Sequence, residues 1–330
     1  MTLMRQEASE TWQRIQQQID TNGELCENVA KRIRECDPAF VYIVGRGTSD
    51  HAGVYARYLI EVELGLVVAA AAPSVASLFS RQLKLSRALV LLISQSGRSA
   101  DILAQARAAK ESGAIVIALV NDIYSPLAAL AHFAIPLLAG AEKAVAATKS
   151  YLCTLAAIIQ LVAYWKQDSS LLAGLSNLPQ QLKLVLEQPK QLQLHHLQQL
   201  RHCIVLGRAF GYAISREIAL KIKEVCGIQA EAFSSAEFLH GPVSLLNQPL
   251  TLLNVMIVDE SAKAHELQIA EVCKRGGDVI NLHVFLPEIH PRIQPLLLMQ
   301  RFYLDIEAIA VAMGLNPDAP VGLNKVTITL

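Results

Sequence analysis

The sequence predicts an α/β protein with two tandem domains, each built on a doubly wound, mostly parallel, five-stranded sheet flanked by helices. The chain has 330 residues, which is more than a single hydrophobic core usually organises. From Phe40 onward, short apolar runs alternate with segments of helical period, a pattern typical of βαβ units. The alternation starts again at His202, so the second half of the chain repeats the architecture of the first.

The first half is expected to alternate strands with helices. Its apolar runs are strand-sized and end at proline or polar residues, which is typical of buried parallel strands. The segments between them place apolar residues at helical spacing. The expected strands are 40–45, 66–71, 88–94, 114–120 and 132–138, and the expected helices are 49–65, 99–113 and 145–166.

Two similar turns indicate that a whole domain is duplicated. VYIVGRGTSDHAG at 41–53 and CIVLGRAFGYAIS at 203–215 align on a Gly-Arg pair that ends a strand just before a helix. In open α/β sheets ligands bind beyond the carboxyl ends of the strands, so we expect a binding site near these turns. The second half is expected to form strands at 202–207, 250–259 and 278–286 and helices at 212–227, 264–277 and 292–313.

The segment between the two halves differs in composition from both. It is rich in Leu and Gln from Ser169 to Leu200, has a helical period and contains few β-branched residues, so we interpret it as a connecting pair of helices. The expected organisation is an N-terminal helical segment (1–37), a first domain (38–168), the helical connector (169–200), a second domain (201–316) and a C-terminal tail (317–330).

Composition excludes several classes of protein. Lys and Arg together equal Asp and Glu at 29 each, so no broad basic field for nucleic acid is expected. Hydrophobic residues make up 52% of the chain, but the densest runs are much shorter than the ~20 apolar residues of a membrane-spanning helix. The amino terminus is polar and lacks the apolar core of a secretory signal, so we expect a cytoplasmic protein.

No metal or nucleotide cofactor is expected. The six cysteines form no CxxC pair, which argues against a disulfide framework and against a thiolate zinc site. His195 and His196 are adjacent, and adjacent helical side chains diverge rather than share a metal. GRGTSD at 45–50 lacks the last glycine of the dinucleotide pattern and has Asp50 there, whose carboxylate would repel a pyrophosphate. A glycine-containing turn is the simpler interpretation.

SQSGRSAD at 94–101 is a candidate phosphate site. It places Ser94, Gln95, Ser96 and Ser99 between a buried strand and the amino end of a helix, where hydroxyls, backbone N–H groups and the helix dipole converge. The alternative is that one serine caps the helix and the others are solvated. Thr48 and Ser49 follow the neighbouring strand, and they are candidates for adding hydroxyls to the same site.

Two further patterns are candidates for proton transfer. Glu217, Lys221 and Glu224 share one helical stripe, which suits acid-base work but also suits an ordinary solvated Glu-Lys pair. His240 precedes Gly241-Pro242, where the proline ends a helical turn and leaves the imidazole at a loop edge. Histidine titrates near neutral pH, although a single histidine is more often structural.

Taken together, these motifs resemble one family, the tandem sugar-isomerase (SIS) domain proteins. The resemblance is to the isomerase half of glucosamine-6-phosphate synthase and to its deaminase relatives, and it covers nearly the whole chain. The motifs occur in the family's order: GTS at 47–49, SQSGRSAD at 94–101, VAATK at 145–149, ALKIKE at 219–224, AEFLHGP at 236–242 and NKVT at 324–327.

The resemblance implies a role for each motif. The serine segment and Ser49 would hold a sugar phosphate, and Val145 and Ala147 would line the path of the sugar. Glu224 would move a proton between C1 and C2, and His240 would open the pyranose ring. Glu217 and Lys221 would belong to the active-site stripe. Lys325 would close over the sugar as part of the tail. The family is homodimeric, with the histidine loop reaching the partner's site, and needs no metal or nucleotide.

The chain also departs from the synthase pattern. It starts at the SIS region without the glutaminase domain, and its first cysteine is Cys26, so we do not expect it to take ammonia from glutamine. Arg46 stands where the synthase has a small thiol residue, Ala147 replaces a hydroxyl, and Val321 replaces an arginine of the tail. These changes leave the sugar specificity open.

The resemblance and the absence of a glutaminase favour a glucosamine-6-phosphate deaminase that releases fructose 6-phosphate and ammonia. The alternatives on the same scaffold are a fructosamine-phosphate deglycase and a plain phosphosugar isomerase. A non-catalytic sugar-phosphate sensor would need the serine segment without Glu224, His240 and Lys325, all of which are present. A DNA-binding regulator is less expected, because the 37 residues before Pro38 are too few for a helix-turn-helix plus a linker.

Overall fold

The computed structural model describes residues 1–79 and 81–325, and the chain forms two compact units. The division falls within helix α8 (Ser169–Leu186), where Pro179 removes a backbone hydrogen bond from the helix interior. The domain limits expected from the sequence follow the repeat of the strand-helix pattern, whereas the two units are defined by contacts between residues. Those limits therefore stay a prediction. Of the described residues, unit 1 comprises Met1–Glu10, Lys143–Thr148 and Gln180–Lys325, and unit 2 comprises Thr11–Glu142 and Lys149–Pro179.

Unit 2 contains a parallel sheet with the strand order β2-β1-β3-β4-β5, and within the described residues it has the five strands that the sequence predicts. Neighbouring strands pair in parallel, with Ile43 opposite Leu91 and Leu91 opposite Ile117. Every residue of β3 is buried, as expected for a central strand covered on both faces. The strands are β1 (Phe40–Val44), β2 (Val68–Ala70), β3 (Ala88–Ser94), β4 (Ile115–Val120) and β5 (Phe133–Pro136).

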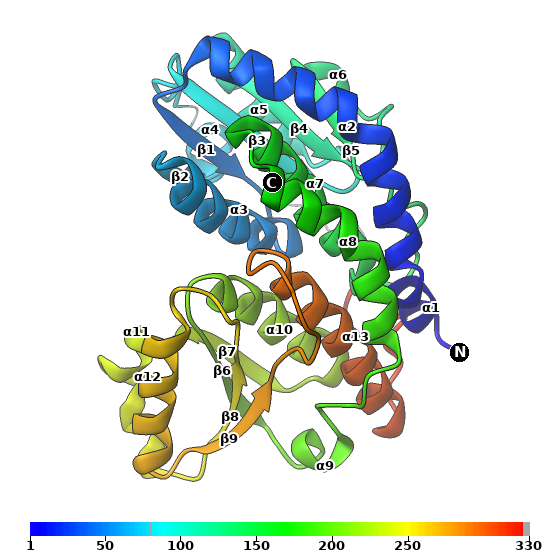
Figure 1. Ribbon diagram of the computed structural model, residues 1–330, viewed down its shortest axis with the longest axis vertical. Coiled ribbons are helices and arrows are strands. Elements are labelled where there is room, and N and C mark those ends of the chain that lie inside the picture. The colour runs from blue at the N-terminus through cyan, green and yellow to red at the C-terminus, as the bar shows by residue number, and fades with distance from the viewer. Residues whose placement is uncertain (80, 326–330) are drawn as a thin grey trace. The chain divides into compact units, whose positions relative to one another are not determined.

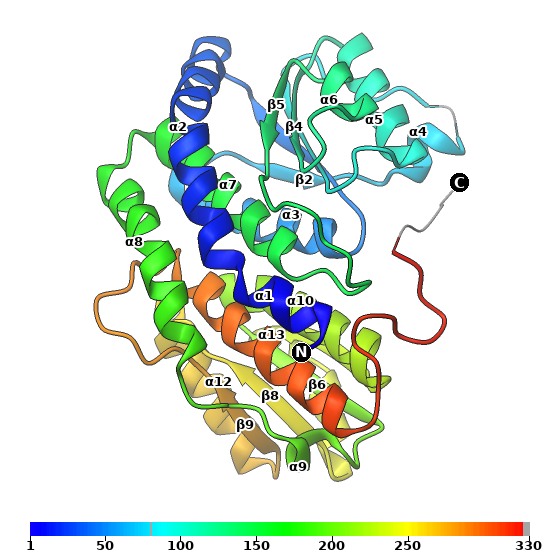
Figure 2. The same ribbon diagram turned by 90° about the vertical axis from the view of Figure 1, so that its right-hand side faces the viewer.

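Helices cover both faces of this sheet. Alternate strand residues such as Tyr42, Val90 and Ala118 pack against Ile102 and Ala106 on one face. Figure 2 shows α5 and α6 on that side and α2 and α7 on the other. The helices of unit 2 are α2 (Thr11–Cys36), α3 (Thr48–Leu64), α4 (Ser74–Ser77), α5 (Ala100–Glu111), α6 (Pro126–Leu130) and α7 (Lys149–Lys166).

The helix predicted over 145–166 begins at Lys149 instead. The Glu142 carboxylate accepts hydrogen bonds from the Ser150 backbone N–H at 3.1 Å and from the Ser150 hydroxyl at 2.6 Å. A carboxylate that accepts from a first-turn N–H caps a helix, so Glu142 fixes the start of α7. Residues 143–148 form no regular element, and they belong to unit 1.

Unit 1 contains a second parallel sheet, with the order β7-β6-β8-β9. It has four strands within the described residues, so the prediction of five in this domain is wrong. The expected last strand, 278–286, ends at Leu282, and Pro287 and Pro291 follow before the chain enters α13. Within the part of the chain that the structure describes, no later segment joins this sheet. The strands are β6 (His202–Gly207), β7 (Gln229–Ser234), β8 (Thr251–Val255) and β9 (Asp278–Leu282).

The second sheet also has helices on both faces. Figure 1 shows α11 and α12 on one side of it and α10 and α13 on the other. The connector predicted as two helices contains the 18-residue α8 but only a four-residue second helix, α9. The remaining helices of unit 1 are α1 (Leu3–Ser9), α9 (Leu194–Leu197), α10 (Phe210–Cys226), α11 (Ser235–Leu239), the 3₁₀ helix η1 (Pro242–Asn247), α12 (Ala262–Lys274) and α13 (Gln294–Ala312).

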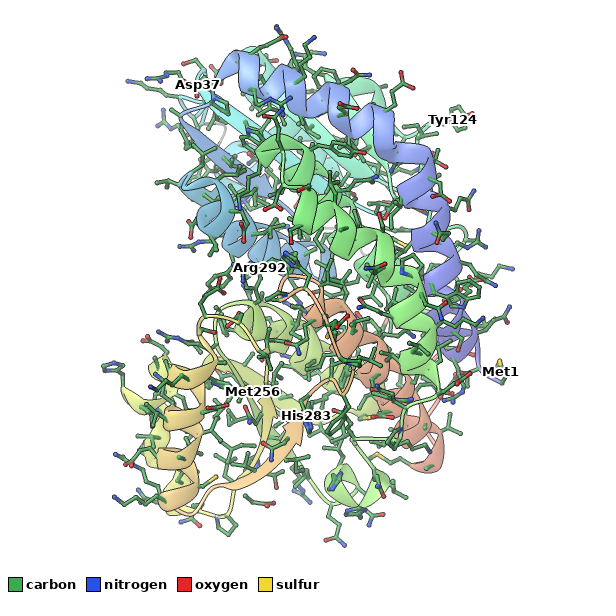
Figure 3. All side chains as sticks on the ribbon, viewed as in Figure 1. Met1, Asp37, Tyr124, Met256, His283 and Arg292 are labelled. Carbon is green, nitrogen blue, oxygen red and sulfur yellow. The ribbon has the colours of Figure 1, made fainter. Side chains whose placement is uncertain are left out.

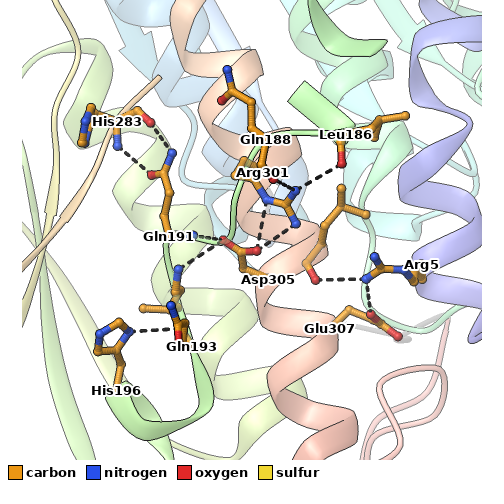
Figure 4. Close-up of polar contacts among 12 residues, drawn as sticks. Arg5, Leu186, Gln188, Gln191, Gln193, His196, His283, Arg301, Asp305 and Glu307 are labelled. Carbon is orange, nitrogen blue, oxygen red and sulfur yellow. Dashed lines mark hydrogen bonds and ion pairs between the residues drawn. The ribbon is translucent and has the colours of Figure 1, made fainter. Parts of the chain in front are cut away.

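Two buried residues of α13 hold the segment between α8 and α9 (Figure 4). Arg301 donates to the Gln188 carbonyl at 3.0 Å, and the Asp305 carboxylate accepts from the backbone N–H groups of Gln191 at 2.9 Å and Leu192 at 3.2 Å. Burial raises the pKa of Asp305, although the Arg301 charge and these N–H groups oppose the rise. The irregular segment therefore has its backbone polar groups satisfied by one helix.

No helix in the described part of the chain has both the length and the apolar character that crossing a bilayer requires.

The two Gly-Arg turns have the same backbone geometry, which supports the duplication. Gly47 has φ 53° and ψ −127°, and Ala209 has φ 45° and ψ −116°. In each turn the arginine carbonyl accepts from the residue three positions on, at 3.0 Å after β1 and 2.7 Å after β6. These values are typical of a type II′ turn, whose first central residue is normally glycine. Ala209 is therefore strained where Gly47 is not.

We expect Ala209→Gly to stabilise the protein by ~1 kcal/mol, because glycine adopts this backbone conformation without a Cβ clash. Gly47→Ala is the matched control and should destabilise by a similar amount, since a Cβ there meets nothing within 4 Å and only the backbone is strained. Thermal unfolding midpoints of the three proteins measure both effects. A lower midpoint for Ala209→Gly would contradict the assignment of strain.

Candidate active site

The serine segment forms a tight turn between β3 and α5 in unit 2. The Ser94 hydroxyl, at the end of β3, accepts from the Gly97 N–H at 3.1 Å. Gly97 has φ 63°, and a Cβ at this position would lie 2.2 Å from the Ser125 hydroxyl oxygen. Only glycine fits both constraints, so the turn is fixed by residues of its own motif and by the loop after β4.

The hydroxyls of this turn are placed for an anion. Ser99 occupies the N-cap position of α5, with an extended backbone at φ −63° and ψ 125°, but its side chain makes no capping hydrogen bond. The alternative in which this serine caps the helix is therefore wrong. Gln95, Ser96 and Ser99 are half-buried. A phosphate beside the first turn of α5 would meet hydroxyls, N–H groups and the positive end of the helix dipole.

An arginine brings positive charge to the same turn. The Arg46 Nε donates to Asp101 Oδ2 at 2.7 Å, and the Arg46 Nη2 lies 2.6 Å from the same oxygen. The Asp101 side chain is fully buried, whereas that of Arg46 is 47% exposed. Asp101 thus fixes the orientation of the guanidinium and leaves part of it open to solvent. The sequence marked Arg46 as a departure but did not reveal its partner.

Thr48 and Ser49 open α3 after the neighbouring strand β1. Because β1 and β3 are adjacent and parallel, these half-buried residues and the serine turn lie at the same edge of the sheet. The structure therefore brings together the predicted phosphate-binding residues of unit 2: Thr48, Ser49, Ser94, Gln95, Ser96 and Ser99.

The second domain does not repeat this turn. The segment after β8, residues 256–261, carries Asp259 and Glu260; Figure 3 labels Met256 at its start, and Arg292, which comes shortly before α13. Glu260 and Arg292 form a two-pronged ion pair at 2.7 and 2.8 Å, and the hydrogen bond to Arg292 lowers the pKa of Glu260 to about 2. Two carboxylates and no serine turn make this edge unsuitable for a phosphate.

The predicted acid-base stripe lies on α10 in unit 1. The Lys221 side chain is 1% exposed, and its Nζ lies 3.2 Å from Glu217 Oε1 and 2.5 Å from Glu224 Oε2. Glu217 is fully buried and Tyr303 of α13 donates to it at 3.4 Å, whereas the Glu224 side chain is 22% exposed. The alternative of a solvated Glu-Lys pair is therefore wrong.

The protonation of Lys221 follows from its neighbours. Burial alone would lower the pKa of this ammonium, but the charges of Glu217 and Glu224 and their hydrogen bonds outweigh burial and raise it. Lys221 is thus a permanent cation that neutralises the buried Glu217. Glu224 contacts the same ammonium and still has an open side, which is what a carboxylate needs to reach a bound carbon acid.

Lys325 and the 143–148 segment form a second cluster in unit 1. The Lys325 ammonium donates to the Ala144 carbonyl at 2.7 Å, next to Val145 and Ala147, which are both half-buried. The Val145 N–H donates to the Asp318 carbonyl at 2.9 Å. The structure therefore places the tail lysine beside the residues predicted to line the sugar path. Val321 is fully exposed. Val326 and Thr327 of the NKVT motif lie outside the described residues.

The amino terminus supports this cluster. Glu7 of α1 accepts from the backbone N–H groups of Lys143 at 2.5 Å and Ala144 at 3.2 Å. Asp318 accepts from the N–H groups of Leu3 and Met4 at 2.9 and 2.8 Å. Sequence motifs do not reveal these contacts, because Glu7 and Asp318 lie in segments without a pattern and act through backbone groups.

His240 stands apart from the stripe. It is exposed at the C-terminal end of α11, where its backbone N–H donates to the Glu237 carbonyl at 3.0 Å. Within residues 1–79 and 81–325, its ring makes no hydrogen bond or ion pair with Glu217, Lys221 or Glu224. A search of the same described residues finds no group of three or more His, Cys, Asp or Glu side chains arranged for a metal ion.

Two solved structures resemble this chain in fold, and one of them also resembles it in sequence. A structure of a proposed phosphosugar isomerase from Silicibacter pomeroyi is 37% identical, covers 96% of this chain and all of its own, and superposes with a TM-score of 0.90. The glucosamine-6-phosphate deaminase of Thermotoga maritima shares the fold at 20% identity, with a TM-score of 0.78 over 99% of this chain and all of its own.

A curated relative matches most of the present chain but only about half of its own length. Glutamine–fructose-6-phosphate aminotransferase from Clostridium acetobutylicum is 30% identical over 93% of this chain and 53% of its own length. The chain thus spans about half the length of the curated relatives it matches. The SIS domain family model matches residues 32–164. With the S. pomeroyi likeness over both whole chains, these matches show that the chain belongs to the SIS domain family.

Proposed function

We propose that the chain is a phosphosugar isomerase of the deaminating type, which converts glucosamine 6-phosphate and water into fructose 6-phosphate and ammonia. The observation that carries the proposal is the buried Lys221, which holds Glu224 by an ion pair at 2.5 Å while that carboxylate keeps an open side. A carboxylate placed in this way suits proton transfer between two neighbouring carbons. The family resemblance and the deaminase and isomerase names of the structural relatives point the same way.

The proposed reaction assigns a step to each group. The serine turn and Arg46 bind the phosphate, and His240 moves the proton that opens the pyranose ring. Glu224 removes the C2 proton of the open aldehyde, which gives an enolamine, and returns a proton to C1. The product is an imine at C2, which water attacks, so the C–N bond breaks and ammonia leaves as the ketone forms. Lys325 closes the site over the sugar. No redox step occurs.

The same groups would serve a plain aldose-ketose isomerase or a fructosamine-phosphate deglycase, because both need a phosphate site and a carbon acid-base. Incubation with glucosamine 6-phosphate, with ammonia and fructose 6-phosphate measured in parallel, separates these cases. Equal amounts of both products are expected. Turnover only of fructosamine phosphates, or aldose-ketose conversion without ammonia, would replace the deaminase assignment. No turnover of any of these sugars would favour a sensor.

Glu224→Gln should lower kcat by ~10²- to 10⁴-fold and leave the Kd for glucosamine 6-phosphate unchanged, because the amide keeps the shape but cannot accept the C2 proton. The matched control is Glu231→Gln, which changes an exposed glutamate of β7. Steady-state kinetics and titration calorimetry supply the two readouts. Native-like kcat in Glu224→Gln would remove this residue from the chemistry.

Replacing both Ser96 and Ser99 by Ala should raise the KM for glucosamine 6-phosphate by about 10- to 100-fold, because each hydrogen bond to a charged group contributes about 1.5–3 kcal/mol and part is regained from water. Ser112→Ala is the control, since this serine lies at the other end of α5 and bonds to the Ala108 carbonyl at 2.8 Å. An unchanged KM would mean that the phosphate binds elsewhere.

We also propose a homodimer in which His240 acts in the partner's site, in line with its exposure and its lack of contact with Glu224. Co-expression of Glu224→Gln and His240→Asn subunits tests this. In a mixed dimer, one site would then combine a native Glu224 with a native His240, and random association would restore about one quarter of the native activity. If each subunit uses its own His240, no activity returns in the mixture.

A further inference from the structure

A buried polar network ties helix α11 to the rest of unit 1. We call Ser235, Asn254, His265 and Gln268 the His265 network. The His265 Nδ1 lies 2.8 Å from the Ser235 hydroxyl, and its Nε2 lies 2.7 Å from Asn254 Oδ1. The Ser235 Oγ also lies 2.5 Å from the side-chain amide of Gln268. Ser235, His265 and Asn254 are 0, 1 and 3% exposed.

The network joins three elements. Ser235 begins α11, His265 and Gln268 lie one turn apart on α12, and Asn254 lies on β8, where it donates to Asn281 of β9 at 2.8 Å. Burial, assisted by the positive charge of Arg208, lowers the pKa of His265 to about 4. The ring is therefore neutral at pH 7, with one donor and one acceptor nitrogen: Nε2–H donates to Asn254 Oδ1, and Nδ1 accepts from the Ser235 hydroxyl.

Helix α11 cannot hold its own orientation. It has five residues, and isolated helices shorter than about 12 residues are marginal in water. Its fixed points are the Ser235 hydroxyl, the fully buried Phe238 ring and the Ser234 hydroxyl, which accepts from Arg208 at 3.1 Å. His240 follows directly at its C-terminal end. The direction in which His240 projects is thus set by how α11 is held against α12.

Packing alone would not need polar side chains at these positions. Buried polar groups destabilise a protein when they are left unpaired, and apolar side chains of the same volume would fill the space. A fully paired network defines one geometry, whereas apolar contacts allow sliding and rotation. The Phe238 ring alone would permit α11 to turn about its contact with α12.

We propose that His265 is a positioning residue for His240: through Ser235 it fixes the orientation of α11 and with it the place of the ring-opening imidazole. The inference rests on the proposed function. Nothing else in the mechanism involves His265, which is buried and meets no substrate. Its effect on turnover should therefore pass through His240 alone.

A double-mutant cycle tests this dependence. His265→Leu removes both hydrogen bonds at similar volume, and should lower kcat/KM about 10- to 100-fold in the native background, as expected for a misplaced catalytic group. In the His240→Asn background, where spontaneous ring opening sustains residual turnover, the same change should cost less than about twofold. Equal losses in both backgrounds, or no loss in the native one, would overturn the proposal.

Three variants control for folding. His265→Asn keeps a group that reaches Ser235 and should recover most of the activity. Ser235→Ala breaks the same link from the other side and should match His265→Leu, in case the leucine variant does not fold. His195→Leu changes an exposed histidine outside the network and should leave kcat/KM unchanged.

Amide hydrogen exchange supplies a readout that does not depend on the reaction. In His265→Leu, exchange should rise across residues 235–241 and stay native in α10. If residues 235–241 of His265→Leu exchange as slowly as those of the unmutated protein, the positioning role is contradicted. If the unmutated protein does not turn over these sugars but His265→Leu still loses protection at 235–241, the proposed function is refuted, whereas the role of His265 in anchoring α11 stands.

Discussion

The buried ammonium of Lys221 determines how the charged side chains of α10 in unit 1 are arranged. Lys221 is 1% exposed, and an isolated charge at such a depth is not tolerated without partners. Glu217 is as deeply buried and neutralises it. Glu224 then adds a second negative charge to a pair that is already neutral, so the excess charge lies on the one carboxylate with an open side. The carboxylate that we propose as the acid-base is therefore defined by the buried Lys221–Glu217 pair beside it.

The two similar halves of the fold differ in the side chains that follow the third strand of each sheet's order. Both Gly-Arg turns keep the same backbone, even though the second carries a strained alanine. After the third strand in each sheet's order, however, the first copy has SQSGRS and the second has MIVDES. The first segment has hydroxyls and N–H groups that suit an anion. In the second, the Glu260 carboxylate is paired with Arg292, which precedes α13. The copy without a serine turn holds the residues that we propose for proton transfer.

The five strands of the first sheet could be predicted from the sequence, because strand and helix periods differ and the glycine turns are local, whereas β7 was not among the strands expected for the second sheet. Burial of the stripe could not, since Glu217, Lys221 and Glu224 have the same spacing on a solvated face, and Tyr303 covers them from 79 or more residues away along the chain. The end of β9 at Leu282 and the start of α7 at Lys149 were missed because the apolar pattern continues to Leu286 and the helical pattern already begins at Val145. The start of α7 is fixed by Glu142, which no periodic pattern marks.

The cluster around Ala144 shows how both ends of the chain contribute to one placement. Glu7 and Asp318 hold the backbone of residues 143–145, and Asp318 also caps α1, which carries Glu7. The contact of Asp318 with α1 thus helps to place Glu7, which in turn holds the backbone next to the Val145 N–H that Asp318 binds. Lys325 donates to the Ala144 carbonyl within this arrangement, so the position of its ammonium depends on contacts made by both ends of the chain.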